Sequence, residues 1–265
     1  MRQGIDLIVV SYKTPRDLRG FLDSYVDYPS TVPTSLIIMN NQPEPEDVRV
    51  VDRFVKLYQP ENFIHHPSKE NLFYSGAANL GVTFGDREII GILNADTELR
   101  ETTLDDLYKG FHDYPDAGVL GPLQYDEHNK VTHGGIFGTL SRPEHRGWHA
   151  KIHESYRNVA KAVTVSGSAY FIRRAVWDEL HGCDVYNTTV EDPEGAFLPT
   201  SHYYEETWCS YHAQAHHYDV MYYGQAEMMH RWHTATPKGG WSDQQMPLSR
   251  IQFRQACDDH GIAHD

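Results

Sequence analysis

Short apolar segments alternate with helical patterns through residues 1–100, and this alternation restricts the chain to few folds. The apolar segments are residues 5–10, 35–39, 63–66 and 89–93. Helical patterns occupy the intervening residues 17–28, 46–57 and 75–84. Strands that alternate with helices form right-handed βαβ units, which build a mainly parallel sheet covered by helices. The sequence therefore predicts an α/β fold around such a sheet.

The rest of the chain is less regular. We expect helices over residues 103–114 and 206–215, and strands over residues 118–121, 163–172 and 219–223. Residues 124–162 are rich in His, Gly and Arg, which predicts long loops. Residues 186–201 hold Asn, Thr, Asp, Pro and Gly and predict an excursion from the core.

Polar residues follow three of the predicted strands at the point where each strand ends. They are Ser11 and Tyr12, then Asn40 and Asn41, then Asn94 and Asp96. Ligands of parallel α/β sheets bind beyond the carboxyl ends of the strands. We therefore expect these residues to converge on one site, although a short Asn-Asp-Thr turn also suits the cap of a following helix.

Charge and cysteine content exclude several classes of protein. The net charge of -14 argues against nonspecific nucleic-acid binding, which needs a basic face. The three Cys residues are widely spaced, which predicts neither a disulfide framework nor a zinc ribbon. Because the sequence shows neither a signal peptide nor an apolar run long enough to cross a bilayer, we expect a cytoplasmic protein.

Six segments in order resemble family 2 glycosyltransferases of the GT-A fold, most closely the rhamnosyltransferase-like branch. They are the Asn40-Asn41 turn, ENLFYSGAANLG at 70–81, NADT at 94–97, VSGSAYFIRR at 165–174, and YYEET at 203–207 with a later AEMMH at 226–230. The resemblance implies one GT-A domain over residues 1–235. Residues 1–100 would bind the donor, residues 101–235 would shape the acceptor site, and residues 236–265 would form a C-terminal lid or tail.

The resemblance also implies roles at the reaction centre. The donor would be a nucleotide-diphosphate-sugar, and the acceptor a hydroxyl of a glycan, lipid-linked sugar, protein or modified base. Asp96 and His230 would hold a divalent cation, Mn or Mg, that stabilises the departing diphosphate; His233 competes with His230 for this role. An inverting transfer needs a general base, for which Glu206 matches the family position and Glu205 is the alternate.

The remaining matched residues are expected to contact the nucleotide. They are Ser11, Tyr12, Asn40, Asn41, Ser75, Gly76, Asn79 and, for the ribose, Asn94. Asn94 and the Asn40-Asn41 pair replace acids that are common in relatives. This departure keeps two other functions open, a nucleotide-sugar-binding protein without catalysis and a nucleotidyltransferase.

Three further features have two interpretations each. His212 and His216 have the spacing of a zinc pair, although a solvated helix face is the simpler expectation. Lys238, in a Gly-rich segment, suits a lid over the diphosphate or a mobile tail. Residues 128–153 are expected to face the acceptor, and Trp148 to stack on a ring.

Overall fold

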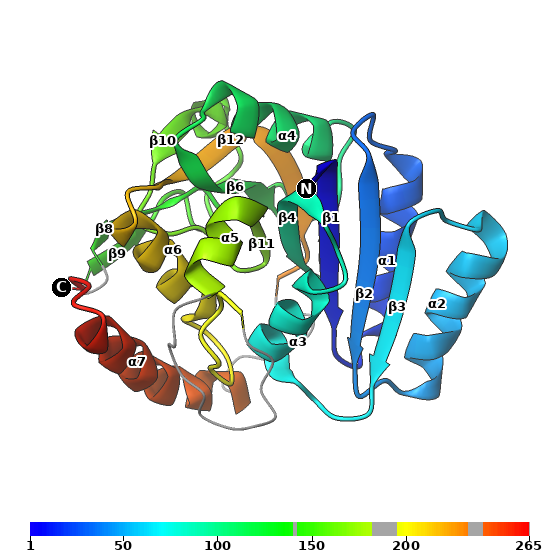
Figure 1. Cartoon of the computed structure of the whole chain (residues 1–265). Coiled ribbons are helices and arrows are strands. Elements are labelled where there is room, and N and C mark those ends of the chain that lie inside the picture. Colours follow the sequence, from blue (N-terminus) through cyan, green and yellow to red (C-terminus); the bar gives the residue numbers. More distant parts are fainter. Residues whose placement is uncertain (140–141, 182–194, 233–240, 265) are drawn as a thin grey trace.

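A computed structural model describes residues 1–139, 142–181, 195–232 and 241–264. One large sheet runs through it, with helices on both faces (Figure 1). The strands in spatial order are β10 (Val159–Lys161), β12 (Asp219–His230), β6 (Ala117–Tyr125), β11 (Ala169–Arg173), β4 (Arg87–Asn94), β1 (Arg2–Ser11), β2 (Thr34–Asn41) and β3 (Phe63–Ser68). Strands β1 to β4 pair in parallel, as do β6 and β12, which confirms the mainly parallel sheet.

Two hydrophobic clusters separate the helices into layers. Helices α1 (Pro15–Asp27), α2 (Pro45–Tyr58) and α4 (Thr103–Asp113) pack on one face, and α3 (Phe73–Val82), α5 (Arg174–His181) and α6 (Glu205–Ala215) pack on the other. Strand β1 shows why: Leu7 and Val9 join the first cluster, while Ile8 and Val10 join the second. Successive side chains of a strand point to opposite faces, so a strand buried on both faces is apolar throughout.

Local signals at the helix ends match the predicted boundaries. Pro15 and Pro45 occupy the first turns of α1 and α2, where the missing N–H costs nothing. At the start of α2, Glu44 and Asp47 form a reciprocal capping box. Helix α7 (Trp241–Asp259) packs against α6 through a third cluster that contains Trp208 and Phe253.

The prediction of long loops over residues 124–162 is wrong. The segment contains β7 (Val131–His133), β8 (Ile136–Thr139), β9 (Arg142–His145), the 3-10 helix η1 (Glu154–Arg157) and β10. Strand β7 pairs with β6, and β8 pairs with β9 in a separate two-stranded sheet. These strands are only three or four residues long, too short to show an apolar period, and they depend on pairing with other segments.

Several strands differ from their predicted lengths, and two of them, β11 and β12, bear on the site. Strand β11 is shorter than the apolar pattern of 163–172, because before Ala169 this segment forms only an isolated bridge, from Thr164 to Ile136. Strand β12 is longer and continues to His230, so that its carboxyl end pairs with the two-residue strand β5 (Thr97–Glu98). This extension brings the end of β12 to the turn that follows β4.

Candidate functional site

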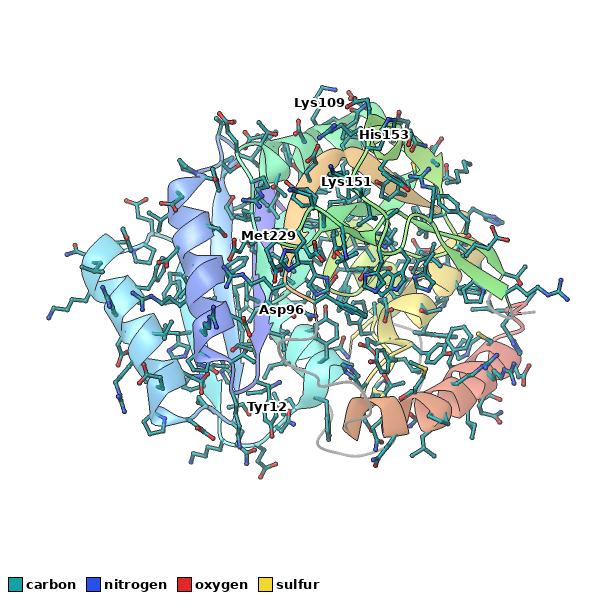
Figure 2. All side chains as sticks on the ribbon, turned by 180° about the vertical axis from the view of Figure 1, so that it is seen from behind. Tyr12, Asp96, Lys109, Lys151, His153 and Met229 are labelled. Carbon is teal, nitrogen blue, oxygen red and sulfur yellow. The ribbon has the colours of Figure 1, made fainter. Side chains whose placement is uncertain are left out.

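The three polar strand ends lie side by side, as predicted. Ser11 of β1 is in register with Asn40 of β2, and Val10 is in register with Asn94 of β4. Ser11, Asn40 and Asn41 are buried, whereas Tyr12 is 44% exposed at the same edge. Figure 2 shows Asp96 near the centre of the molecule, with Tyr12 below it and Met229 above. The carboxyl edge of the sheet is therefore a continuous polar margin.

The turn at Asn94–Thr97 does not cap a helix. Its backbone is held by β1, because Ala95 N donates to Val10 O at 3.2 Å, and the Thr97 hydroxyl donates to Asn94 O at 2.8 Å. The chain then forms the two-residue strand β5 that pairs with β12, and α4 begins only at Thr103. The turn therefore leaves the Asp96 carboxylate at the sheet edge.

Asp96 and His230 meet at this edge from distant parts of the chain. His230 pairs with Thr97 in the β5–β12 ladder, and Arg231 N donates to Asp96 O at 2.9 Å. These backbone bonds bring His230 Nε2 to 3.5 Å from Asp96 Oδ1, with both residues buried. A carboxylate oxygen beside an imidazole nitrogen suits Mn²⁺ better than Mg²⁺, which prefers oxygen alone. Across the described ranges, His, Cys, Asp and Glu side chains form no group of three or more that could hold a metal.

A pair of acidic residues opens helix α6. Glu205 is 4% exposed, and its Oε2 lies 2.9 Å from the Thr200 hydroxyl. Burial and the neighbouring Glu206 charge raise the pKa of Glu205 to about 8, and burial raises the pKa of Glu206 to about 7. Both predicted base candidates therefore sit together, and burial raises the pKa of each carboxyl above that of an exposed glutamate.

Tyr74 connects the two groups of acids, although the sequence did not single it out. Its hydroxyl donates to the backbone oxygen of Gly167, and a Cβ on Gly167 would lie 3.3 Å from the Glu206 side chain. The pKa of Tyr74 is raised by burial and then by the charges of Glu205, Glu206 and Asp96. The charges of the predicted base and of the predicted metal ligand therefore both act on the Tyr74 hydroxyl. The only sequence signal for Tyr74 was its place in the segment 70–81.

Ser75, Gly76 and Asn79 lie in α3 and are buried. The Ser75 hydroxyl donates to Thr200 O at 3.0 Å, and Asn79 exchanges hydrogen bonds with the backbone of Phe197. Their role as nucleotide contacts stays a prediction, while their observed partners lie in the segment that leads to α6.

An aromatic patch, formed by Trp148, His149 and Trp232, lies beside the end of β12. The Trp148 and Trp232 rings are 4.8 Å apart and nearly perpendicular, and His149 lies 4.9 Å from Trp232. Trp148 is 40% exposed, as its predicted contact with an acceptor requires. Arg146, two residues before Trp148, is held in place because its guanidinium group lies over three aromatic rings.

The expectation of a solvated face at His212 is wrong. His212 is buried against Trp208 and His260, while His216 contacts Glu179 at 2.7 Å. The third cluster covers this side of α6 because α7 packs on it. His233 and Lys238 lie outside the described residues. In the part of the chain that the structure describes, no helix combines the length and the apolar character needed to cross a bilayer.

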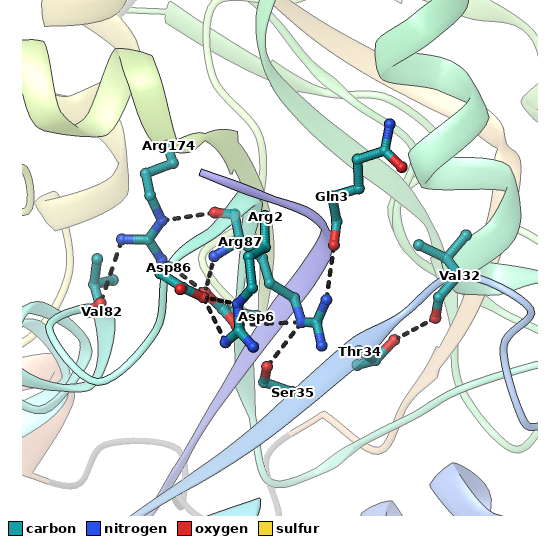
Figure 3. Close-up of polar contacts among 10 residues, drawn as sticks. All are labelled: Arg2, Gln3, Asp6, Val32, Thr34, Ser35, Val82, Asp86, Arg87 and Arg174. Atoms are coloured by element: carbon teal, nitrogen blue, oxygen red, sulfur yellow. Dashed lines mark hydrogen bonds and ion pairs between the residues drawn. The ribbon is translucent and has the colours of Figure 1, made fainter. Parts of the chain in front are cut away.

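A second polar cluster lies at the opposite end of β1 (Figure 3). Asp6 is fully buried, and its Oδ2 accepts hydrogen bonds from Arg87 N at 2.8 Å and from Arg174 Nη2 at 2.9 Å. The Arg87 guanidinium also donates to Ser35 and to the backbone of Gln3. Because the charges are paired and enclosed, this cluster fastens β1, β2, β4 and α5 together and is not a ligand site.

Comparisons with known proteins agree with the fold described above. The family description "Glycosyl transferase family 2" matches residues 6–178. No curated protein sequence matches.

Two solved structures share the fold. The mannosyltransferase PcManGT from Pyrobaculum calidifontis, in complex with GDP-Man and Mn2+, is 14% identical with a TM-score of 0.63, over 95% of this chain and 65% of that chain. S. aureus TarS 1-349 is 13% identical with a TM-score of 0.57, over 87% of this chain and 60% of that chain. The chain therefore spans less than two thirds of either neighbour.

Proposed function

Because the chain belongs to glycosyl transferase family 2, we propose that it transfers a sugar from a nucleotide-diphosphate-sugar to an acceptor hydroxyl, with inversion and with a divalent cation. The observation that carries the proposal is the contact between Asp96 and His230 at the sheet edge where the polar strand ends meet. PcManGT, which shares the fold, was solved with GDP-Man and Mn2+.

Asp96 and His230 would hold the cation, and the donor diphosphate would supply further ligands. Manganese is the better candidate because one of the two ligands is a nitrogen. The bound cation would stabilise the negative charge that develops on the leaving diphosphate. Asn94 lies one residue from the backbone bond between Ala95 and β1, where its amide suits the ribose.

Glu206 is the proposed general base. A base works best when its pKa lies near the working pH. Burial has raised the pKa of the Glu206 carboxyl towards neutral pH. Glu206 accepts the proton of the acceptor hydroxyl as the hydroxyl attacks the anomeric carbon of the donor. Glu205 is more deeply buried and is hydrogen-bonded to Thr200, so we expect it to stabilise the position of Glu206 and not to contact the acceptor.

The two halves of the chain would then divide the substrates. Residues 1–100 carry the donor edge, with Tyr12 exposed for stacking on the base, and residues 101–235 carry the aromatic patch. The patch places two apolar tryptophan rings beside one histidine, an arrangement suited to stacking on a sugar ring of the acceptor. Figure 2 shows Tyr12 and Met229, the neighbour of His230, on different sides of Asp96.

Nucleotide binding tests the proposal without knowledge of the sugar. GDP, UDP and dTDP are added to the protein with and without Mn²⁺, and thermal unfolding is followed. A nucleotide at about 100 times its dissociation constant stabilises the fold by ~2.7 kcal/mol. Asp96→Ala should lose the part of this gain that depends on Mn²⁺, and Glu206→Gln should keep it. Equal metal-dependent gains in the wild type and Asp96→Ala would remove Asp96 from the metal site.

A binding protein without catalysis is the second candidate, favoured by Asn40, Asn41 and Asn94 at positions where acids are common. The first two are buried at the donor edge. Metal-dependent nucleotide binding together with no donor hydrolysis, in the wild type as in Glu206→Gln, would favour this candidate.

A further inference from the structure

Two polar side chains of α3 form hydrogen bonds to residues 197–200, the segment that leads to the acid pair Glu205 and Glu206. Asn79 Nδ2 donates to Phe197 O at 3.0 Å, and Phe197 N donates to Asn79 Oδ1 at 3.2 Å. One turn earlier, the Ser75 hydroxyl donates to Thr200 O at 3.0 Å. Residues four apart in a helix lie on the same face, so Ser75 and Asn79 act together. We call this pair the α3 clamp.

The clamped segment determines where the acid pair lies. Thr200 is the first link, because its hydroxyl contacts both Glu205 and the backbone oxygen of Tyr203. Tyr203 and Tyr204 then have φ of 69° and 72°, a left-handed conformation that non-glycine residues adopt rarely and at a cost. Such a conformation persists only where surrounding contacts impose it, and the α3 clamp supplies contacts on the amino-terminal side of the turn.

The same helix faces the acid pair through its first turn. Tyr74, next to Ser75, donates to the backbone of Gly167, against which Glu206 packs. Helix α3 therefore reaches the acids along two routes, through Thr200 to Glu205 and through Gly167 to Glu206. At its start, α3 is tied to the donor edge, since Asn41 Nδ2 donates to Phe73 O at 2.9 Å.

We propose that Ser75 and Asn79 are positioning residues for Glu205 and Glu206, and that they do not contact the nucleotide. The assignment rests on the proposed function, in which Glu206 is the base. The buried amide of Asn79 both donates to and accepts from the Phe197 backbone, so turning this amide towards a ligand would break both hydrogen bonds. A base displaced by about 1 Å loses on the order of a hundredfold in rate, so fixing this segment has a direct catalytic value.

The test compares Asn79→Ala and Ser75→Ala with Thr83→Ala, a matched control at the exposed end of α3 whose hydroxyl bonds only locally. Hydrogen exchange is followed over residues 195–206, the dissociation constant for UDP or GDP is measured with Mn²⁺, and the glutamate carboxyls are titrated by NMR. We expect exchange in this segment to rise at least about tenfold, as loss of a buried hydrogen bond implies. The titration of the acid pair should move towards ordinary carboxyl values, while nucleotide affinity changes less than about twofold, a difference of ~0.4 kcal/mol.

A nucleotide contact predicts the reverse. A loss of affinity of about tenfold or more, with exchange and carboxyl titration as in Thr83→Ala, would overturn the proposal. Ser75→Ala removes one hydroxyl only, so it remains informative where Asn79→Ala does not fold. Exchange and titration need no substrate, so a wild type that binds no nucleotide would refute the proposed function while these two measurements still decide for or against the clamp. With an active donor, kcat should fall in both variants while KM for the donor stays constant.

Discussion

Replacing the acid pair with amides should stabilise the protein above pH 5. Glu205→Gln/Glu206→Gln keeps the shape of both side chains and removes their charge. The hydrogen bonds at Thr200 already point to a proton on Glu205: the Thr200 hydroxyl has one proton, but it lies 2.9 Å from both Tyr203 O and Glu205 Oε2. A protonated Glu205 can donate a hydrogen bond to the Thr200 hydroxyl, whose own proton is then donated to Tyr203 O.

The size of the effect follows from proton linkage. An unfolded glutamate loses its proton near pH 4.3, whereas the folded pair holds protons until about pH 7 and 8. Stability from these groups is therefore complete below the unfolded pKa and is lost as the pH rises through the folded values. Each extra proton held by the folded state changes the free energy of unfolding by about 1.4 kcal/mol per pH unit. The pair holds between one and two such protons from pH 5 to pH 7, which amounts to ~3–5 kcal/mol.

Urea unfolding at pH 5, 6 and 7 measures this difference directly. The free energy of unfolding of the double variant, minus that of the wild type, should rise with pH by about 3–5 kcal/mol over the two units. Other titrating groups cancel in the subtraction, and Glu61→Gln, at an exposed position, gives the background for losing a carboxylate. A difference that stays flat from pH 5 to pH 7 would show that the pair titrates as ordinary carboxyls, and the reasoning from burial would fail.

Two further predictions concern Asp6 and Gly167. Asp6→Asn leaves Arg87 and Arg174 buried without their counter-charge, so the free energy of unfolding should fall by about 3–5 kcal/mol. Urea unfolding measures this loss, and a value below about 1 kcal/mol would contradict the burial of the two arginines with Asp6. Gly167→Ala places a methyl group 3.3 Å from the Glu206 side chain, so donor turnover should fall by about tenfold or more while nucleotide affinity is kept. Equal losses of turnover and affinity in Gly167→Ala would show that the residue shapes the donor site instead.

The first half of the fold could be predicted because its signals are local. Strands β1 and β4 carry apolar runs at residues 7–10 and 89–93, and each ends in a polar residue at the sheet edge. The position of Asp96 in the turn after β4 followed from this pattern. The convergence of Ser11, Asn40 and Asn94 followed in turn from the parallel register.

The rest of the site depends on contacts between distant segments. The resemblance paired Asp96 with His230, but the β5–β12 ladder that brings them together involves a two-residue strand, too short to leave a pattern. Tyr74 lay in the matched segment 70–81 but was not singled out, because a single tyrosine at a helix start is usually a packing residue. Asn79 and Ser75 matched a family segment, yet their partners at 197–200 lie in a stretch that the sequence marks only as irregular.

The pairing of β5 with the end of β12 also has a consequence for biosynthesis. A ribosome makes Asp96 well before it makes His230, and strands β4 and β6 are complete before β11, which lies between them in the sheet. A nascent chain that has reached only the donor half therefore carries an open strand edge on β4. The proposed cation site at Asp96 and His230 would form only after β12 has been synthesised and has joined β6, so a chain stalled before that point would hold an open sheet edge and Asp96 without His230.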